Sequence, residues 1–222
     1  MTKRILILVE GQTEEQFVKT VLGPALYPDG IFPVATILTT KRVKDGPNFK
    51  GGVTSYSKFK QDLNLVRAGA ADAMITTMLD YYGLPADFPG MDTRMVHAST
   101  IDRVRHIERE IASDVSDHRF VPFLALHEFE ALLFSCDNTL PNVIGEPDKQ
   151  QTFAAVNALF SSPEEINENP GSNPAARITA MFPGYRKVLH GPTAIKRIGL
   201  NLARARCRHF DDWVCALETV TS

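Results

Sequence analysis

Short apolar runs alternate with amphipathic segments along the first part of the chain. Four continuously apolar, partly β-branched runs predict buried strands at residues 3–9, 32–38, 73–79 and 120–126. Between these runs, apolar residues at helical spacing predict helices at residues 14–27, 56–68 and 99–112. Strands and helices that alternate in this way are typical of an α/β fold with a parallel sheet and right-handed crossovers.

Local signals predict how some of these segments begin and how they are joined. Thr13 is expected to cap the first helix with Gln16 as its capping-box partner, and Ser99 with Asp102 is expected to open the helix at 99–112. Proline and glycine over residues 83–90 predict an irregular loop. Glycine and basic residues predict a second, basic loop over residues 41–52.

The strand pattern stops near residue 137. Helices are predicted at residues 148–160, 172–182 and 192–220, and we expect Trp213, Phe210 and Leu217 to anchor the last of them. The chain is therefore expected to form an α/β domain over residues 1–136, with a parallel sheet of about four strands flanked by helices. A helical extension over residues 137–222 is expected to pack on it.

Composition narrows the class of protein. The chain has 222 residues, of which 44% are hydrophobic and 23% are charged, which is ordinary for a globular protein with a sizeable core. The formal net charge of -2 gives no electrostatic footprint for nucleic acid over the whole molecule, so any such surface must be local. The basic segment between Arg186 and Arg208 is the candidate for that surface.

Cysteine usage and hydropathy indicate a cytoplasmic protein without a membrane partner. Cys136, Cys207 and Cys215 are too few and too scattered for a zinc site or a disulfide framework, and an odd count suits a reducing cytoplasm. The first apolar run, Ile5 to Val9, leads directly into acidic residues and is too short for a signal peptide or a membrane span.

Acidic residues follow three of the predicted strands: Glu10, Asp80, and the pair Glu128 and Glu130. Because parallel strands end at the same edge of a sheet, where open α/β folds bind ligands, these acids are expected to converge. Converging carboxylates repel one another unless a cation neutralises them, and hard oxygen ligands suit Mg²⁺ or Mn²⁺. The alternative is that each acid only caps a helix or solvates a loop, but three acids in register favour a metal site.

Three further residues are auxiliary candidates for this site. Glu14 lies in the first turn of a helix, where the helix dipole stabilises an acid in any case. Asp87 would otherwise shape a turn beside proline. His127 could bind a metal, act as a general base or relay protons, or it could be a structural hydrogen-bonding residue.

Two other stretches carry candidates for substrate contact. Residues 182–192 combine glycine, proline, two cations and a histidine, so Lys187 and His190 could contact phosphate in a loop there. A rigid turn between helices explains the same residues. Tyr81 and Tyr82 could stack on a base, although we expect both to pack beneath the loop that follows them.

Residues 9–14, Val-Glu-Gly-Gln-Thr-Glu, resemble the first motif of the Toprim superfamily. This superfamily includes the catalytic domains of topoisomerases and primases and the overcoming-lysogenization-defect (OLD) nucleases. The resemblance implies a Rossmann-like Toprim sheet, with Glu10 in acid–base chemistry or metal binding. The second Toprim motif is Asp-x-Asp. Asp80 matches its first aspartate, but Tyr82 replaces the second, so Asp87, Glu128 or Glu130 would have to supply the missing ligand.

Nearly the whole chain also resembles a bacterial group of uncharacterised Toprim-like proteins related to RloB. The recognisable stretches are residues 79–85, 127–134, 182–191 and 207–213. Such proteins are often encoded beside ABC or AAA ATPases, in abortive-infection and other phage-defence loci. The resemblance implies a defence effector with a partner ATPase.

Three functions are compatible with these patterns. The leading hypothesis is a Mg²⁺- or Mn²⁺-dependent nuclease for DNA or RNA, in which Glu10, Asp80 and Glu128 are catalytic and Glu130 completes the metal shell. The second is a non-catalytic scaffold or regulatory partner of an ATPase, favoured by the incomplete Asp-x-Asp motif. The third is a phosphoacceptor domain with Asp80 as acceptor. It is disfavoured because phosphoacceptor domains normally place a lysine directly after a late strand, and none stands directly after the strand at 120–126.

Overall fold

The computed structural model describes residues 3–38, 53–70, 72–95, 97–166 and 171–219. The basic loop predicted at residues 41–52 lies outside the described residues. Within the described part of the chain, no helix combines the length and the hydrophobicity that a membrane span requires.

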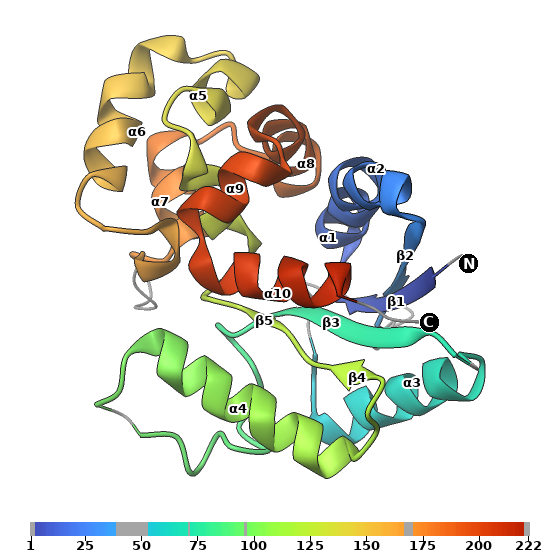
Figure 1. Ribbon diagram of the computed structural model, residues 1–222. Helices are drawn as coiled ribbons and strands as arrows, with labels where there is room; N and C mark the ends of the chain where they lie inside the picture. Colours follow the sequence, from blue (N-terminus) through green and yellow to red (C-terminus); the bar gives the residue numbers. More distant parts are fainter. Residues whose placement is uncertain (1–2, 39–52, 71, 96, 167–170, 220–222) are drawn as a thin grey trace, which may run out of the picture.

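A parallel sheet forms the centre of the molecule (Figure 1). Strands β1 (Lys3–Val9), β2 (Ile31–Ile37) and β3 (Met74–Asp80) confirm three of the predicted strands. All pairings are parallel, and the strand order is β2-β1-β3-β4 with β5 also paired to β3. The carboxyl ends of β1 and β3 therefore lie side by side at one edge of the sheet.

The fourth predicted strand, at residues 120–126, is interrupted. It forms two short strands, β4 (Phe120–Val121) and β5 (Leu124–Ala125), on either side of Pro122. Proline has no N–H to donate to a sheet. The side chain of Thr77 takes over the pairing here, because its Oγ1 accepts from Phe123 N and donates to Phe123 O, both at 2.8 Å.

The side chains of β1 alternate between two hydrophobic layers. Ile5, Ile7 and Val9 belong to one buried cluster, and Leu6 and Leu8 belong to the other. This is the two-residue period of a strand that is buried on both faces. Figure 1 shows α3 (Tyr56–Ala68) and α4 (Thr100–Val115) on the second face of the sheet, and the remaining helices beside or above the first.

The helices α3 and α4 confirm the predictions at 56–68 and 99–112. Ser55 caps α3 by accepting a hydrogen bond from Lys58 N. Ser99 caps α4 as expected, because its Oγ accepts from Asp102 N at 3.2 Å and donates to the Asp102 carboxylate at 2.6 Å.

The first helical segment differs from the prediction at its start. It comprises α1 (Gln12–Phe17), a π-helical turn (Val18–Leu22) and α2 (Gly23–Leu26), followed by a 3-10 turn (Tyr27–Asp29). The predicted cap at Thr13 is wrong. Gly11 is the N-cap, no side chain caps the helix, and Thr13 is buried inside its first turn. Pro24 cannot donate to the carbonyl four residues earlier, which accounts for the wider turn before it.

Residues beyond β5 form mostly helices. A 3-10 helix, η3 (Phe129–Ser135), comes first and is buried throughout. The elements after it are α5 (Thr139–Ile144), the 3-10 turn Pro147–Lys149, α6 (Gln150–Asn157), the 3-10 turn Pro163–Glu165, α7 (Pro174–Met181), α8 (Lys187–Ile198), α9 (Leu200–Arg206) and α10 (Arg208–Glu218).

Helix α8 begins earlier than predicted. The loop expected over residues 182–192 ends at Lys187, and Pro192 lies inside the helix. Close packing offsets the backbone hydrogen bond that Pro192 cannot make. A Cβ added to Gly191 would lie 3.4 Å from both Thr13 Cγ2 and Phe129 Cε1, so glycine lets α8 approach α1 and η3 closely.

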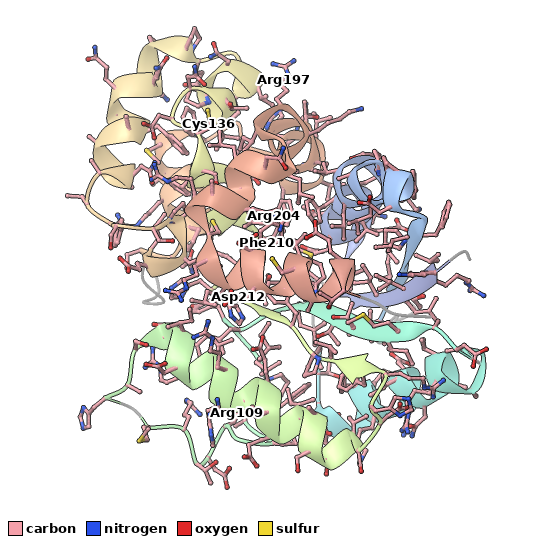
Figure 2. The ribbon with its side chains drawn as sticks, in the orientation of Figure 1. Arg109, Cys136, Arg197, Arg204, Phe210 and Asp212 are labelled. Carbon is pink, nitrogen blue, oxygen red and sulfur yellow. The ribbon has the colours of Figure 1, made fainter. Side chains whose placement is uncertain are left out.

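The last helix is anchored on the sheet as predicted. Phe210, Trp213 and Leu217 of α10 are buried in the first hydrophobic cluster, and Phe210 is labelled in Figure 2. Trp213 Nε1 donates to Thr76 Oγ1 of β3 at 2.9 Å. This cluster contains residues from both sides of the predicted domain boundary at residue 136, so the helical part packs directly on the sheet.

Candidate functional site

Two of the predicted site residues lie side by side at the carboxyl edge of the sheet. Glu10 follows β1 directly, and Asp80 is the last residue of the neighbouring strand β3. Asp80 N donates to Glu10 Oε1 at 2.9 Å, and Asp80 Oδ1 accepts from Phe129 N at 3.0 Å. The backbone of the sheet and of η3 thus fixes both carboxylates in place.

Two further carboxylates join them from helical elements. Glu14 lies in the first turn of α1 and is 4% exposed, and Glu130 lies in η3 and is 0% exposed. Because α1 begins only two residues after Glu10, its first turn stays above the end of β1. We call Glu10, Glu14, Asp80 and Glu130 the acid cluster.

Lys187 is the cation of this cluster. It is the first residue of α8, and its Nζ lies 3.0 Å from Glu130 Oε2, 3.9 Å from Asp80 Oδ2 and 4.0 Å from Glu14 Oε1. Its side chain is 41% exposed, so it reaches the carboxylates from the solvent side. Among the described residues, Lys187 is the one cation that ion pairs join to these acids, and one ammonium group balances only part of the charge of four carboxylates.

Burial, and to a smaller degree the neighbouring charges, perturb the acid–base properties of the cluster. Burial raises the pKa of Glu10 to about 7, against the hydrogen bond from Asp80 N, and the charge of Glu14 adds to the increase. Burial likewise raises the pKa of Glu14 and of Asp80, and Lys187 opposes both shifts. Burial alone would lower the pKa of Lys187, but the carboxylates of Asp80, Glu130 and Glu14 outweigh it and raise that pKa.

Glu128 and Asp87 bind the starts of helices instead. Glu128 Oε1 accepts from Ala175 N at 2.7 Å, in the first turn of α7. Asp87 Oδ2 accepts from Tyr56 N at 2.9 Å, at the first residue of α3. A carboxylate is stabilised at both positions by the free N–H groups of the helix terminus.

The two candidate histidines, His127 and His190, also make hydrogen bonds within the protein. His127 is 1% exposed, its backbone lies in the left-handed region at φ 68°, and its carbonyl accepts from Tyr82 N at 2.9 Å. His190 Nδ1 accepts from Arg186 N at 3.0 Å, at the start of α8. Partial burial and the charge of Arg186 lower the pKa of His190.

An open pocket of about 810 Å³ lies beside the acid cluster. Glu10, Asp80 and Glu128 line it together. One wall is the segment after β3, Tyr82 to Leu84, and the opposite wall is α7 with the residues just before it. A ligand of small-molecule or nucleotide size fits a pocket of this volume.

The basic segment between Arg186 and Arg208 contains an arginine that forms ion pairs within the protein. Arg204 of α9 pairs with Asp211 and Glu218 of α10, and Figure 2 labels it where α9 meets α10. Arg105 of α4 pairs in turn with Asp212 of α10 at 2.6 Å. These arginines hold helices together, so they do not form a free basic surface.

Sequence reasoning missed Tyr185 and the position of Lys187 among the acids. Tyr185 OH donates to Glu130 Oε1 at 3.4 Å, and burial together with the neighbouring carboxylates raises the pKa of Tyr185. In the sequence, the only indication was that Tyr185 and Lys187 lie two residues apart within the unusual stretch at residues 182–192. Their meeting with Glu130 depends on the packing of α8 against η3.

The donor set of the acid cluster fits a hard divalent cation. Within the described part of the chain, no three His, Cys, Asp or Glu side chains form a ready-made metal site. Lys187 Nζ instead lies among the carboxylates where a cation would be attracted. Four partly or fully buried carboxylates with oxygen donors only are the kind of ligands that Mg²⁺ and Mn²⁺ prefer.

The fold and the site define a parallel α/β protein with an acid cluster at the carboxyl edge of its sheet. The chain belongs to the family described as "Domain of unknown function (DUF4276)", whose model matches residues 9–218. Comparison with curated proteins gave no match.

One solved structure is similar over most of its length. It is the C-terminal region of the Xanthomonas campestris pv. campestris OLD protein, with 14% sequence identity and a TM-score of 0.37. The similarity covers 96% of this chain and 97% of that chain.

Proposed function

We propose that this protein is a Mg²⁺- or Mn²⁺-dependent nuclease that hydrolyses phosphodiester bonds of DNA or RNA. The observation that carries the proposal is the convergence of four carboxylates from β1, α1, β3 and η3 beside one open pocket. In open parallel sheets, ligands bind at this edge.

The acid cluster would hold the metal ion. All four carboxylates of the cluster supply oxygen donors. The pKa values of Glu10, Glu14 and Asp80 are raised, so their negative charges are unfavourable unless a proton or a cation neutralises them. A bound divalent ion would supply electrostatic stabilisation of the negative charge that develops in phosphodiester cleavage. The predicted ligand Glu128 lines the same pocket but holds the start of α7, so we assign it a supporting role.

Glu10 and Lys187 have further roles in this proposal. Glu10 lines the pocket and could act there either as a metal ligand or as the general base. Lys187 balances the acid cluster in the absence of a metal ion. A cation bound to the carboxylates would release the ammonium group of Lys187 for contact with a phosphate.

The biological setting is proposed from the sequence resemblance. The stretches shared with RloB-like proteins support a phage-defence effector that acts with an ABC or AAA ATPase. An ATPase partner would explain how a nuclease is kept inactive until infection.

The test is a cleavage assay on plasmid, single-stranded DNA and tRNA with Mg²⁺ or Mn²⁺. Glu10→Gln and Asp80→Asn keep the shapes of the side chains and should each reduce cleavage by about 100-fold or more. Glu15→Gln is the matched control, because Glu15 neighbours Glu14 but pairs with Lys19 at 2.8 Å. Equal cleavage by all four proteins would remove the acid cluster from the reaction.

A non-catalytic scaffold is the second candidate. The observation that favours it is the ion pair of Lys187 with Glu130, which neutralises part of the acid cluster without any metal. Crystals soaked in Mn²⁺ would separate the two candidates by anomalous scattering. Manganese at the carboxyl edge supports the nuclease, and density for Lys187 alone among the acids at high Mn²⁺ concentration supports the scaffold.

A further inference from the structure

The two tyrosines after Asp80 have different surroundings. Tyr81 is 7% exposed and packs in the hydrophobic cluster beneath α3 and α4, as expected from the sequence. Tyr82 is 38% exposed and lines the open pocket beside Glu10 and Asp80. The expectation that both tyrosines pack beneath the loop is therefore wrong for Tyr82.

The backbone fixes Tyr82 at the mouth of the pocket. Tyr82 N donates to His127 O at 2.9 Å, and Leu84 N donates to Tyr81 O at 3.2 Å, which closes a tight turn. Gly83 within this turn has φ +85°, a conformation that other residues rarely adopt. An aromatic side chain is thus presented to solvent two residues beyond Asp80.

The other described residues of the pocket offer surface for a base. Its opposite wall on α7 consists of small side chains, Ala175, Ala176, Thr179 and Ala180. None of the described residues that line it is a lysine or arginine. The Tyr82 ring and these small side chains offer stacking and apolar contact to a base.

We propose that this pocket binds one nucleotide of a single-stranded nucleic acid, with its base stacked on the Tyr82 ring. The inference rests on the proposed function and names its substrate class. The carboxylates are recessed, since Glu14 and Glu130 are at most 4% exposed and the Asp80 side chain is 17% exposed. A strand must bend inward to bring a phosphodiester there, and this costs least when the bases are unpaired.

The experiment uses short single strands that carry 2-aminopurine at successive positions, in DNA and in RNA form, with the matching duplexes for comparison. Stacking on an aromatic ring quenches 2-aminopurine fluorescence. The full-length protein and the variants Tyr82→Leu and Tyr82→Phe are titrated with Ca²⁺ present. Tyr27→Leu is the matched control, because Tyr27 is 44% exposed but stacks on Phe32 of β2 and does not line the pocket.

Loss of the aromatic ring at residue 82 should weaken binding of single strands by about 5- to 150-fold and abolish the quenching. Tyr82→Phe and Tyr27→Leu should behave like the wild type, and duplexes should bind more weakly than single strands. In cleavage assays, Tyr82→Leu should raise KM more than it lowers kcat. The DNA and RNA arms identify which strand is preferred.

Two results separate this inference from the proposed function. If metal-dependent cleavage persists while Tyr82→Leu binds and quenches like the wild type, the stacking role of Tyr82 is overturned and the nuclease stands. If Tyr82-dependent quenching persists while the wild type cleaves no nucleic acid with Mg²⁺ or Mn²⁺, the binding pocket stands and the nuclease is overturned. Equal affinity for duplexes and single strands would also contradict the inference.

Discussion

At the scale of single residues, the main feature is a set of buried and half-buried carboxylates that share the cation Lys187 and the end of one sheet. Glu10 and Asp80 are fixed by backbone N–H groups, and Glu14 and Glu130 are buried. Lys187 compensates only part of their charge. A cluster of this kind reduces the stability of the folded chain at neutral pH and is expected at functional sites.

The first prediction concerns pH. The folded state raises the pKa of Glu10 from 4.5 to about 7, so it binds a proton more tightly than the unfolded state does. This contribution to the free energy of unfolding is complete below about pH 4.5 and is lost as pH rises through about 7. The shifts of Glu14 and Asp80 have the same sign. Denaturation by urea without metal ions should therefore show lower stability at pH 8 than at pH 5.5.

Glu10→Gln provides the control for this prediction. Its amide oxygen can still accept from Asp80 N, and it carries no charge. At pH 8 the variant should be more stable than the wild type, by roughly 1–3 kcal/mol, with a smaller dependence on pH. An unchanged dependence on pH in Glu10→Gln would show that the charge of Glu10 does not strain the folded state.

The second prediction concerns Lys187. Lys187→Met removes the cation that pairs with buried Glu130, so the free energy of unfolding should fall by roughly 1–3 kcal/mol. The expected loss is smaller than for a fully buried pair because the Lys187 side chain is 41% exposed. Mn²⁺ should raise the melting temperature of this variant more than that of the wild type, since the metal then replaces the missing charge.

Lys19→Met is the matched control for Lys187→Met. Lys19 lies in the π-helical turn after α1 and pairs with Glu15 at 2.8 Å, and its side chain is 55% exposed, so its removal should change stability by less than about 0.5 kcal/mol. Equal losses in the two variants would mean that Lys187 is an ordinary surface lysine.

At the scale of elements, the position of α8 decides where Lys187 lies. The helix packs against α1 and η3 at Gly191, and Lys187 is one turn earlier on the same helix. The sequence did not predict this arrangement, because glycine and proline at 191–192 are typical of a loop. Pro122 explains the break between β4 and β5. The hydrogen bonds between Thr77 and the backbone of Phe123 could not be predicted, because they form only when β3 lies beside this segment in the folded sheet.

The third prediction tests this packing. Gly191→Leu places a side chain where even a Cβ would lie 3.3 Å from Tyr185 OH and 3.4 Å from Phe129 Cε1. Overpacking should reduce stability by about 1–3 kcal/mol, and Mn²⁺ should raise the melting temperature more than in the wild type, because α8 then carries Lys187 away from the acids as Lys187→Met removes it. Thermal melts with and without Mn²⁺ measure both effects.

Gly184→Leu is the control for Gly191→Leu. An added Cβ at Gly184 has nothing within 4 Å, although the residue lies in the same stretch of the chain. This variant should melt close to the wild type and bind Mn²⁺ normally. If Gly191→Leu behaves in the same way, close packing at Gly191 does not position the site.

At the scale of the whole molecule, the sheet collects residues that are far apart in the sequence. The alternation of apolar and polar segments was enough to predict the parallel sheet and the carboxylates Glu10 and Asp80, because strand ends are local features. The burial of Glu14 and Glu130 and their meeting with Lys187 were not predictable, because they depend on how η3 and α8 pack on α1. The helix-capping positions of Glu128 and Asp87 depend on similar long-range contacts.

Calorimetric titration with Mn²⁺ at about pH 8 measures whether the acid cluster binds a divalent cation. Glu14→Gln and Glu15→Gln change neighbouring acids of α1, of which only Glu14 is in the cluster. We expect the wild type and Glu15→Gln to bind Mn²⁺ with equal affinity, and Glu14→Gln to bind it at least about tenfold more weakly. No Mn²⁺ binding by the wild type, or equal binding by all three proteins, would contradict this expectation.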